Sequence, residues 1–266
     1  MRLRPVLLAA TATCLAGCAA YQAATSIQNN LQTFLVRAIT LNNNGQEQAS
    51  TVLIWGGTNA LNGITKQIAS GSANPFPVNT SSQTATDSVN GGVTYTYTAT
   101  FAKGDPLVRT ITPFSVNDAG QVSVVAPNTS TANLATGNLG TASGPKPTLQ
   151  WSATGTPSGF MVTVGEATVS QNFDPTSIKP LYTAFLDAAT HSTSVTYGTP
   201  SDMPGLTSEL TTLLGGFDKR FAKNDSNVPP LVSGKTYAWL ISPIVVDAKA
   251  TKFGIGNQSF GLFKDQ

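Results

Sequence analysis

The chain has 266 residues, of which only 11% are charged, and a formal net charge of +2. That length accommodates two domains of roughly 100–150 residues each. A charge so close to zero, with no basic patch, argues against nucleic acid as a partner. The one histidine, His191, excludes a zinc or copper site built from several histidines within one chain.

The first twenty residues have the pattern of an export signal. A start bearing Arg2 and Arg4 precedes an uncharged apolar run over 5–15, which is too short to span a bilayer. The run ends in Leu15-Ala16-Gly17-Cys18, which resembles the bacterial lipobox. That resemblance implies a signal peptide over 1–17 and a lipidated Cys18 as the first mature residue. The alternative is an ordinary secretory signal cut near Ala20.

Lipidation at Cys18 would also set the chemistry of the mature protein. The only other cysteine, Cys14, lies in the signal, so neither a free thiol nor a disulfide would remain. Acyl chains such as palmitate would provide the membrane anchor. Ala19 follows the cysteine, which in a diderm cell resembles the pattern for the outer membrane. Residues 18–30 are polar and small, and we expect a tether there.

The first half, 31–127, predicts an immunoglobulin-like β-sandwich. Its clearest strand is 93–101, in which Val93, Tyr95, Tyr97, Ala99 and Phe101 alternate with threonines. We expect the other strands at 34–41, 51–55, 64–69, 107–116 and 122–126, and a long surface loop over 70–92. Residues 128–146 are rich in Pro, Gly, Ser, Thr and Asn and predict a linker.

The second half, 147–266, predicts another β-domain with a helical insertion. We expect strands at 147–151, 160–164, 180–186, 194–197, 236–246 and 259–263. Within 203–221, Leu206, Leu210, Leu213 and Leu214 recur at helical spacing. These leucines either pack a short helix on the sandwich or form a protruding interaction helix.

The second half resembles a fibronectin type III domain. The resemblance rests on Pro147-x-Leu149-x-Trp151, on Phe160-x-Val162-x-Val164 and on the segment Leu231–Tyr237, which is similar to that family's tyrosine corner. The fold class that follows is all-β, with two immunoglobulin-like or fibronectin type III-like β-sandwiches in tandem. The resemblance implies that Trp151 fills the space between two sheets and that Tyr237 bonds backward through its hydroxyl. Trp239 belongs to the same expected core.

Catalytic motifs are missing from the sequence. It contains no Gly-x-Ser-x-Gly elbow, phosphate-binding loop or His-Glu-x-x-His pattern. His191 is either a general base or a solvated loop residue. Asp174 and Asp187 could form a carboxylate pair. Asp105 and Asp118 either bind calcium or belong to turns.

The expected function is therefore binding without catalysis. We expect a lipid-anchored cell-envelope protein with a structural or adhesive role, which binds other envelope or surface-layer proteins and holds no cofactor or metal. The alternative is a carbohydrate-binding surface lipoprotein, in which Tyr95, Tyr97 and Phe101 would stack on a glycan instead of filling a core. An envelope hydrolase is a third reading, and it lacks a recognisable site.

Overall fold

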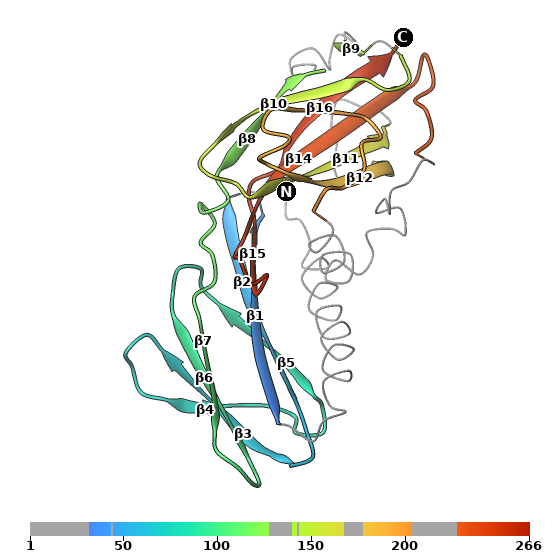
Figure 1. The fold of residues 1–266 in the computed structure, drawn as a ribbon. Coiled ribbons are helices and arrows are strands. Elements are labelled where there is room, and N and C mark those ends of the chain that lie inside the picture. Colours follow the sequence, from blue (N-terminus) through green and yellow to red (C-terminus); the bar gives the residue numbers. More distant parts are fainter. Residues whose placement is uncertain (1–31, 44, 128–139, 143, 168–177, 204–227) are drawn as a thin grey trace. The chain divides into compact units, whose positions relative to one another are not determined.

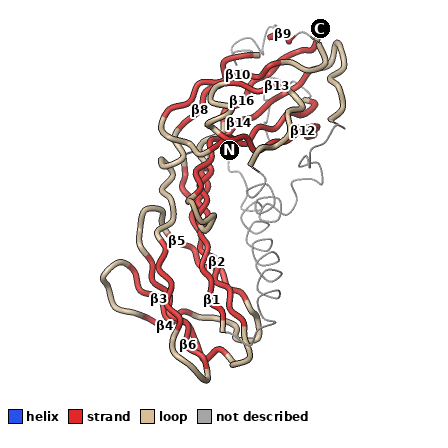
Figure 2. The backbone as a smooth tube through the Cα atoms, in the orientation of Figure 1, coloured by secondary structure: helices blue, strands red, loops and turns tan. Residues whose placement is uncertain are grey.

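The computed structural model describes residues 32–43, 45–127, 140–142, 144–167, 178–203 and 228–266. Every regular element in these ranges is a strand (Figures 1 and 2). Within the same ranges no helix is long and apolar enough to cross a bilayer. The expected signal and tether, and nearly all of the helical insertion, lie outside them, as does most of the expected linker.

The described chain is all-β and divides into two compact units. Of the described residues, the first unit contains those up to Val116 and Val246–Gly254, whereas the second contains those between Asn117 and Val245 and those from Ile255 to Gln266. The boundary at Val116 differs from the expected one at residue 127. The reason is a strand, Gln121–Ala126, that pairs with the second unit's Thr148–Thr154.

Two antiparallel sheets form the first unit. One sheet has the order β15-β1-β2-β5 and the other the order β4-β3-β6-β7. Their strands are β1 (Thr33–Asn43), β2 (Gln46–Gly56), β3 (Leu61–Ile68), β4 (Asn74–Phe76), β5 (Thr84–Val89), β6 (Tyr95–Phe101), β7 (Leu107–Ile111) and β15 (Lys252–Ile255). The expected surface loop over 70–92 therefore contains two strands, β4 and β5. The sequence gives little sign of β5 because only Asp87 and Val89 of its six residues are buried.

The alternating strand β6 supplies the aromatic core of the first unit. Tyr95, Tyr97, Ala99 and Phe101 are buried and the threonines between them are half-buried, as the alternation predicts. Across the unit they pack with apolar residues of the other sheet, which include Phe34, Leu53 and Trp55. This packing shows that one face of each sheet is turned toward a shared core.

The segment Val246–Gly254 adds a strand to the first unit from late in the sequence. The amide of Ala38 on β1 donates to the carbonyl of Thr251 at 2.9 Å. Asp247 closes the preceding turn, since its carboxylate accepts bonds from the amide and hydroxyl of Thr251 and from the amide of Lys252, at 2.6, 2.8 and 2.7 Å. Burial by itself raises the pKa of Asp247, but these bonds and the charge of Lys252 hold that pKa below its ordinary value.

The second unit also consists of two sheets. One has the order β13-β10-β8. The other has the order β12-β11-β14-β16, and β9 pairs in parallel with β16. Their strands are β8 (Gln121–Ala126), β9 (Gly140–Ala142), β10 (Thr148–Thr154), β11 (Gly159–Glu166), β12 (Lys179–Asp187), β13 (Ser194–Thr196), β14 (Thr236–Val246) and β16 (Ser259–Asp265). The short strand β9 lies within the stretch expected to be a linker.

The two units share one strand order. If the short β9 and the added β15 are set aside, the first, second and fifth strands of each unit form one sheet. The remaining four strands form the other sheet, in the order fourth, third, sixth and seventh. The second half therefore repeats the topology of the first, although its loops differ in length.

A tyrosine corner opens the sixth strand of both units. The amide of Val232 donates to the hydroxyl of Tyr237 at 2.8 Å, and the amide of Asn90 donates to the hydroxyl of Tyr95 at 2.9 Å. In both corners the third residue before the tyrosine is a glycine with positive φ, which a residue with a Cβ adopts only under strain. Val89–Tyr95 and Leu231–Tyr237 share their apolar, Gly, Thr and Tyr positions. Of these two motifs, only the second was predicted from the sequence.

Removing the corner hydroxyl should loosen the corner locally. We expect Tyr237→Phe to destabilise the second unit by about 1 kcal/mol, because one partly buried amide loses its acceptor. Hydrogen exchange should become faster at the amide of Val232 and stay unchanged at the amide of Asn90. Tyr95→Phe is the matched control and should reverse the pattern. Unchanged exchange at Val232 in Tyr237→Phe would contradict the role of this bond.

The turn at Asp247 should make the first unit sensitive to acid. Because the folded state lowers the pKa of Asp247, its contribution to stability is present above the unfolded pKa. That contribution is lost as the pH falls from about 4 through the lowered value. Asp247→Asn should weaken the turn at neutral pH and flatten this dependence, measured by hydrogen exchange at Ala38. The exposed Asp105→Asn serves as control and should keep the wild-type profile.

Candidate functional site

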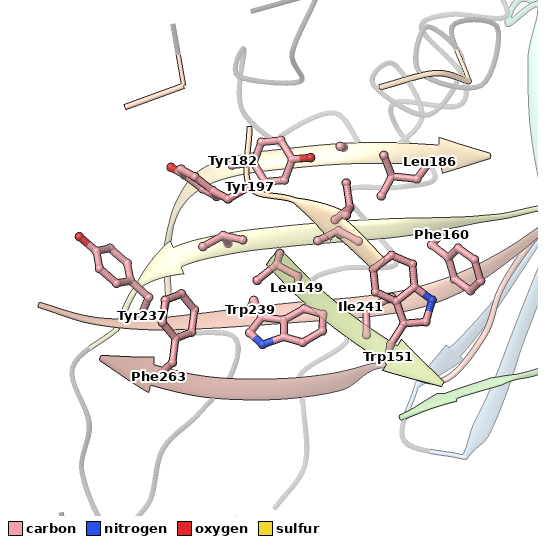
Figure 3. Close-up of a cluster of buried hydrophobic side chains, with 14 of the residues drawn as sticks. Leu149, Trp151, Phe160, Tyr182, Leu186, Tyr197, Tyr237, Trp239, Ile241 and Phe263 are labelled. Carbon is pink, nitrogen blue, oxygen red and sulfur yellow. The ribbon is translucent and has the colours of Figure 1, made fainter. Parts of the chain in front are cut away.

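The residues expected to form the core of the second unit are deeply buried. Trp151, Tyr237 and Trp239 are 2%, 1% and 0% exposed and belong to one cluster between the two sheets (Figure 3). The Nε1–H of Trp239 donates to the carbonyl of Pro127 at 2.8 Å. Trp151 packs on Phe160 with 5.2 Å between ring centroids. These side chains hold the sandwich together and offer no surface to a ligand.

The aromatic stripe of the first unit is buried as well. Tyr95, Tyr97 and Phe101 are 3%, 0% and 6% exposed, so their rings face the core. Sugar stacking needs an aromatic face open to solvent. These three residues therefore cannot serve as the stacking surface of a carbohydrate site.

His191 lies in a loop that closes on itself beyond β12. Its Nε2 is 3.3 Å from Oδ2 of Asp202, and its amide donates to the carbonyl of Asp187 at 2.8 Å. The amide of Asp187 in turn donates to Oδ1 of Asp202 at 2.6 Å. The side chain of His191 is only 18% exposed, so it is less solvated than a free loop histidine. Asp174, the other half of the expected carboxylate pair, and Cys18 lie outside the described residues.

The described acidic residues do not gather into a group that could hold a metal ion. In the described part of the chain, no group of three or more His, Cys, Asp or Glu side chains lies close enough together to hold an ion. Asp105 is exposed in the β6–β7 connection, and Asp118 lies in the turn that precedes β8.

A polar cluster in the first unit links its two sheets. Lys66 and Tyr97 come from adjacent strands of one sheet, β3 and β6, and Thr51 and Asp87 come from adjacent strands of the other, β2 and β5. Oδ2 of Asp87 is 2.6 Å from Nζ of Lys66 and accepts a bond of 2.6 Å from the hydroxyl of Tyr97. The hydroxyl of Thr51 is 2.7 Å from that of Tyr97. Because Tyr97 donates its one proton to Asp87, Thr51 donates to Tyr97.

The cluster is largely withdrawn from water. The side chains of Lys66 and Asp87 are 18% and 11% exposed, and Thr51 and Tyr97 are fully buried. Burial raises the pKa of Tyr97 far above its ordinary value, and its bond to Asp87 raises it further. Tyr97 therefore stays protonated and acts as a donor at any physiological pH. Nζ of Lys66 also lies 4.9 Å from the ring centre of Tyr95.

The second unit fills the matching place with apolar side chains. Counted from the corner tyrosines, Tyr97 corresponds to Trp239, and their cross-strand partners are Lys66 and Val164. Both residues of the second pair are 0% exposed. A buried ion pair is often no more stabilising than the hydrophobic residues that could replace it. Packing alone therefore does not explain the charged pair in the first unit.

The sequence contains one signal for this cluster. Lys66 stands between Ile64 and Ile68 at an inward position of an alternating strand, where a charge requires a partner. Asp87 was hidden in the stretch interpreted as a surface loop. Only the pairing of β5 with β2 places Asp87 beside Thr51 and within reach of Lys66.

Comparisons with known proteins give a distant likeness. No family model matches the chain, and no curated protein matches it. Among solved structures, the chain is similar to the "tetra-tandem repeat in extending region of large adhesion protein", with 10% identity and a TM-score of 0.23 over 87% of this chain and 50% of that one. The chain thus spans half the length of that structure. The description of the fold therefore depends on the strand order of the two units and not on this likeness.

Removing the hydroxyl of Tyr97 should destabilise the first unit measurably. We expect Tyr97→Phe to cost about 1–3 kcal/mol, because Asp87 and Thr51 both lose a buried partner. Tyr197→Phe in the second unit, which loses one bond to the carbonyl of Pro229, is the control and should cost about 1 kcal/mol. Denaturant unfolding followed by hydrogen exchange in each unit measures both effects. A smaller loss in Tyr97→Phe than in Tyr197→Phe would contradict this account of the cluster.

Proposed function

We propose that this chain is a lipid-anchored cell-envelope protein that has a structural or adhesive role and no catalytic activity. Export and anchoring rest on the lipobox-like Leu15–Cys18. The single observation that carries the role is the repeated domain, since one strand order and one tyrosine corner occur twice in the chain. Tandem sandwiches held on a lipid present protein surfaces at a distance from a membrane.

Both units fit the immunoglobulin-like sandwich, and we propose that the second is fibronectin type III-like. Several features support this assignment: the strand order, Trp151 on the second strand of its unit, and Tyr237 at the start of the sixth. The same order in the first unit extends the proposal to a tandem pair. In such folds, loops and sheet edges carry the binding function and the core supports them.

The partner that we propose is another protein of the envelope or the surface layer. The described part of the first unit offers β7 as an edge strand, which pairs with β6 and exposes half of the Val108 side chain. An edge strand with free backbone groups can accept a strand from another chain. In a diderm cell the proposed location is the outer membrane.

Replacing Cys18 tests the anchor. We expect Cys18→Ala to abolish incorporation of a labelled fatty acid and to release the protein from the membrane fraction. Cys14→Ala is the matched control, because Cys14 lies inside the proposed signal and should leave labelling unchanged. Full labelling of Cys18→Ala would overturn the proposed lipidation site.

Gentle detergent extraction tests the binding role. Native electrophoresis of the solubilised wild-type protein should show a complex larger than the monomer, and chemical cross-linking should identify its other protein. A protein that always migrates at monomer size would refute stable complex formation. Binding to purified envelope polysaccharides in the same extract would favour the carbohydrate-binding alternative.

A further inference from the structure

We propose that Lys66 and Asp87 become joined by an intramolecular amide bond that links the two sheets of the first unit. Nζ of Lys66 and Oδ2 of Asp87 are 2.6 Å apart, on strands that belong to different sheets. The inference does not depend on the lipid anchor or on the identity of a partner.

The reaction is a condensation whose atoms balance without any other reagent. A proton passes from the Lys66 ammonium to the Asp87 carboxylate, which leaves a neutral amine beside a carboxylic acid. Nζ then bonds to Cγ of Asp87, and the bond from Cγ to Oδ2 breaks. Oδ2 leaves as water with two of the three ammonium protons, and the third stays on the amide nitrogen. The two charges disappear together.

Tyr97 is placed to act as the acid of this reaction. Its hydroxyl donates at 2.6 Å to Oδ2, the oxygen that must leave. Thr51 donates to the oxygen of Tyr97 and so stabilises negative charge that develops there. The bond from the Tyr97 hydroxyl to Oδ2 also polarises the carboxyl group of Asp87 and makes Cγ easier to attack. Tyr97 touches a reacting atom, and the proposal therefore assigns it a catalytic role.

The fold supplies the proximity that the condensation needs. Well-oriented groups within one molecule react as though they were present at about 10⁵–10⁸ M. Both reacting side chains are largely buried, so the neutral amide is favoured over two charges that water solvates poorly. Because the product carries no charge, it also accounts for Lys66 at an inward position where the second unit has the apolar Val164.

The second unit contains a matched control for the contact itself. Nζ of Lys235 lies 2.7 Å from Oε1 of Glu166, a separation similar to that of Lys66 and Asp87. The side chains of Lys235 and Glu166 are 48% and 41% exposed, so water solvates both charges. We expect this pair to remain ionic. Proximity is thus common to the two pairs, and burial beside a tyrosine hydroxyl distinguishes the first.

Peptide mapping of the full-length protein tests the proposal. Trypsin cuts after Lys and Arg, and the sites that flank Lys66 are Arg37 and Lys103. An acylated Lys66 is not cut, so the digest should contain peptide 38–103, one water lighter than its unmodified mass. Fragmentation should place the link between Lys66 and Asp87. Cleavage after Lys66 with both products at unmodified mass would mean an ion pair only, and would overturn the proposal.

Three variants and one control sharpen the result. Lys66→Arg and Asp87→Ala should each restore the unmodified mass. Tyr97→Phe should slow the appearance of the link at least about a hundredfold in a pulse-labelled time course. Lys235→Arg should leave the link intact. The wild-type map decides the question even if a variant fails to fold, and a link that forms equally fast in Tyr97→Phe would refute the catalytic role of Tyr97.

Discussion

The sixth strand of each unit is the element on which the rest of its sandwich depends. β6 and β14 lie inside their sheets and send alternate large side chains across the core, Tyr95 and Tyr97 in one unit and Tyr237 and Trp239 in the other. The corner bond at the start of each strand sets which face those side chains take, since a shift of one residue would turn all of them outward. The repeated corner therefore supports the register of both cores.

That constraint also explains which parts of the fold could be predicted from the sequence. The alternation in 93–101 indicated a half-buried strand, and β6 has that burial pattern. The strand at 236–246 was likewise predicted, because its apolar run is long and bounded by turns. The stretch containing β5 gave no such signal, since β5 is a short edge strand in which only Asp87 and Val89 are buried and four of the six residues are polar. Asp87, the residue of the polar cluster that contacts both Lys66 and Tyr97, lies on β5 and was therefore not predicted to be buried.

Long-range pairing accounts for the remaining differences. β15 belongs to the first unit although more than a hundred residues separate it from β7, and nothing in Lys252–Ile255 indicates its partner. The amide of Ala38 and the carbonyl of Thr251 meet only once the chain has folded. Similarly, the position of β8 in the sequence suggested that it is the last strand of the first half, but β8 pairs with β10 of the second unit. Local patterns predict that a strand exists, and the strand beside it depends on the whole chain.

The two units have the same strand order but carry different side chains at one equivalent cross-strand position. Where the second unit places Val164 against Trp239, the first places Lys66 against Tyr97 and adds Asp87 and Thr51 from the facing sheet. The apolar pair needs only shape, whereas the polar set must satisfy every donor and acceptor or lose stability. The polar set is also the only one of the two that can react. Because the strand order is the same around both, the difference in chemistry between the units comes from a few side chains and not from the fold.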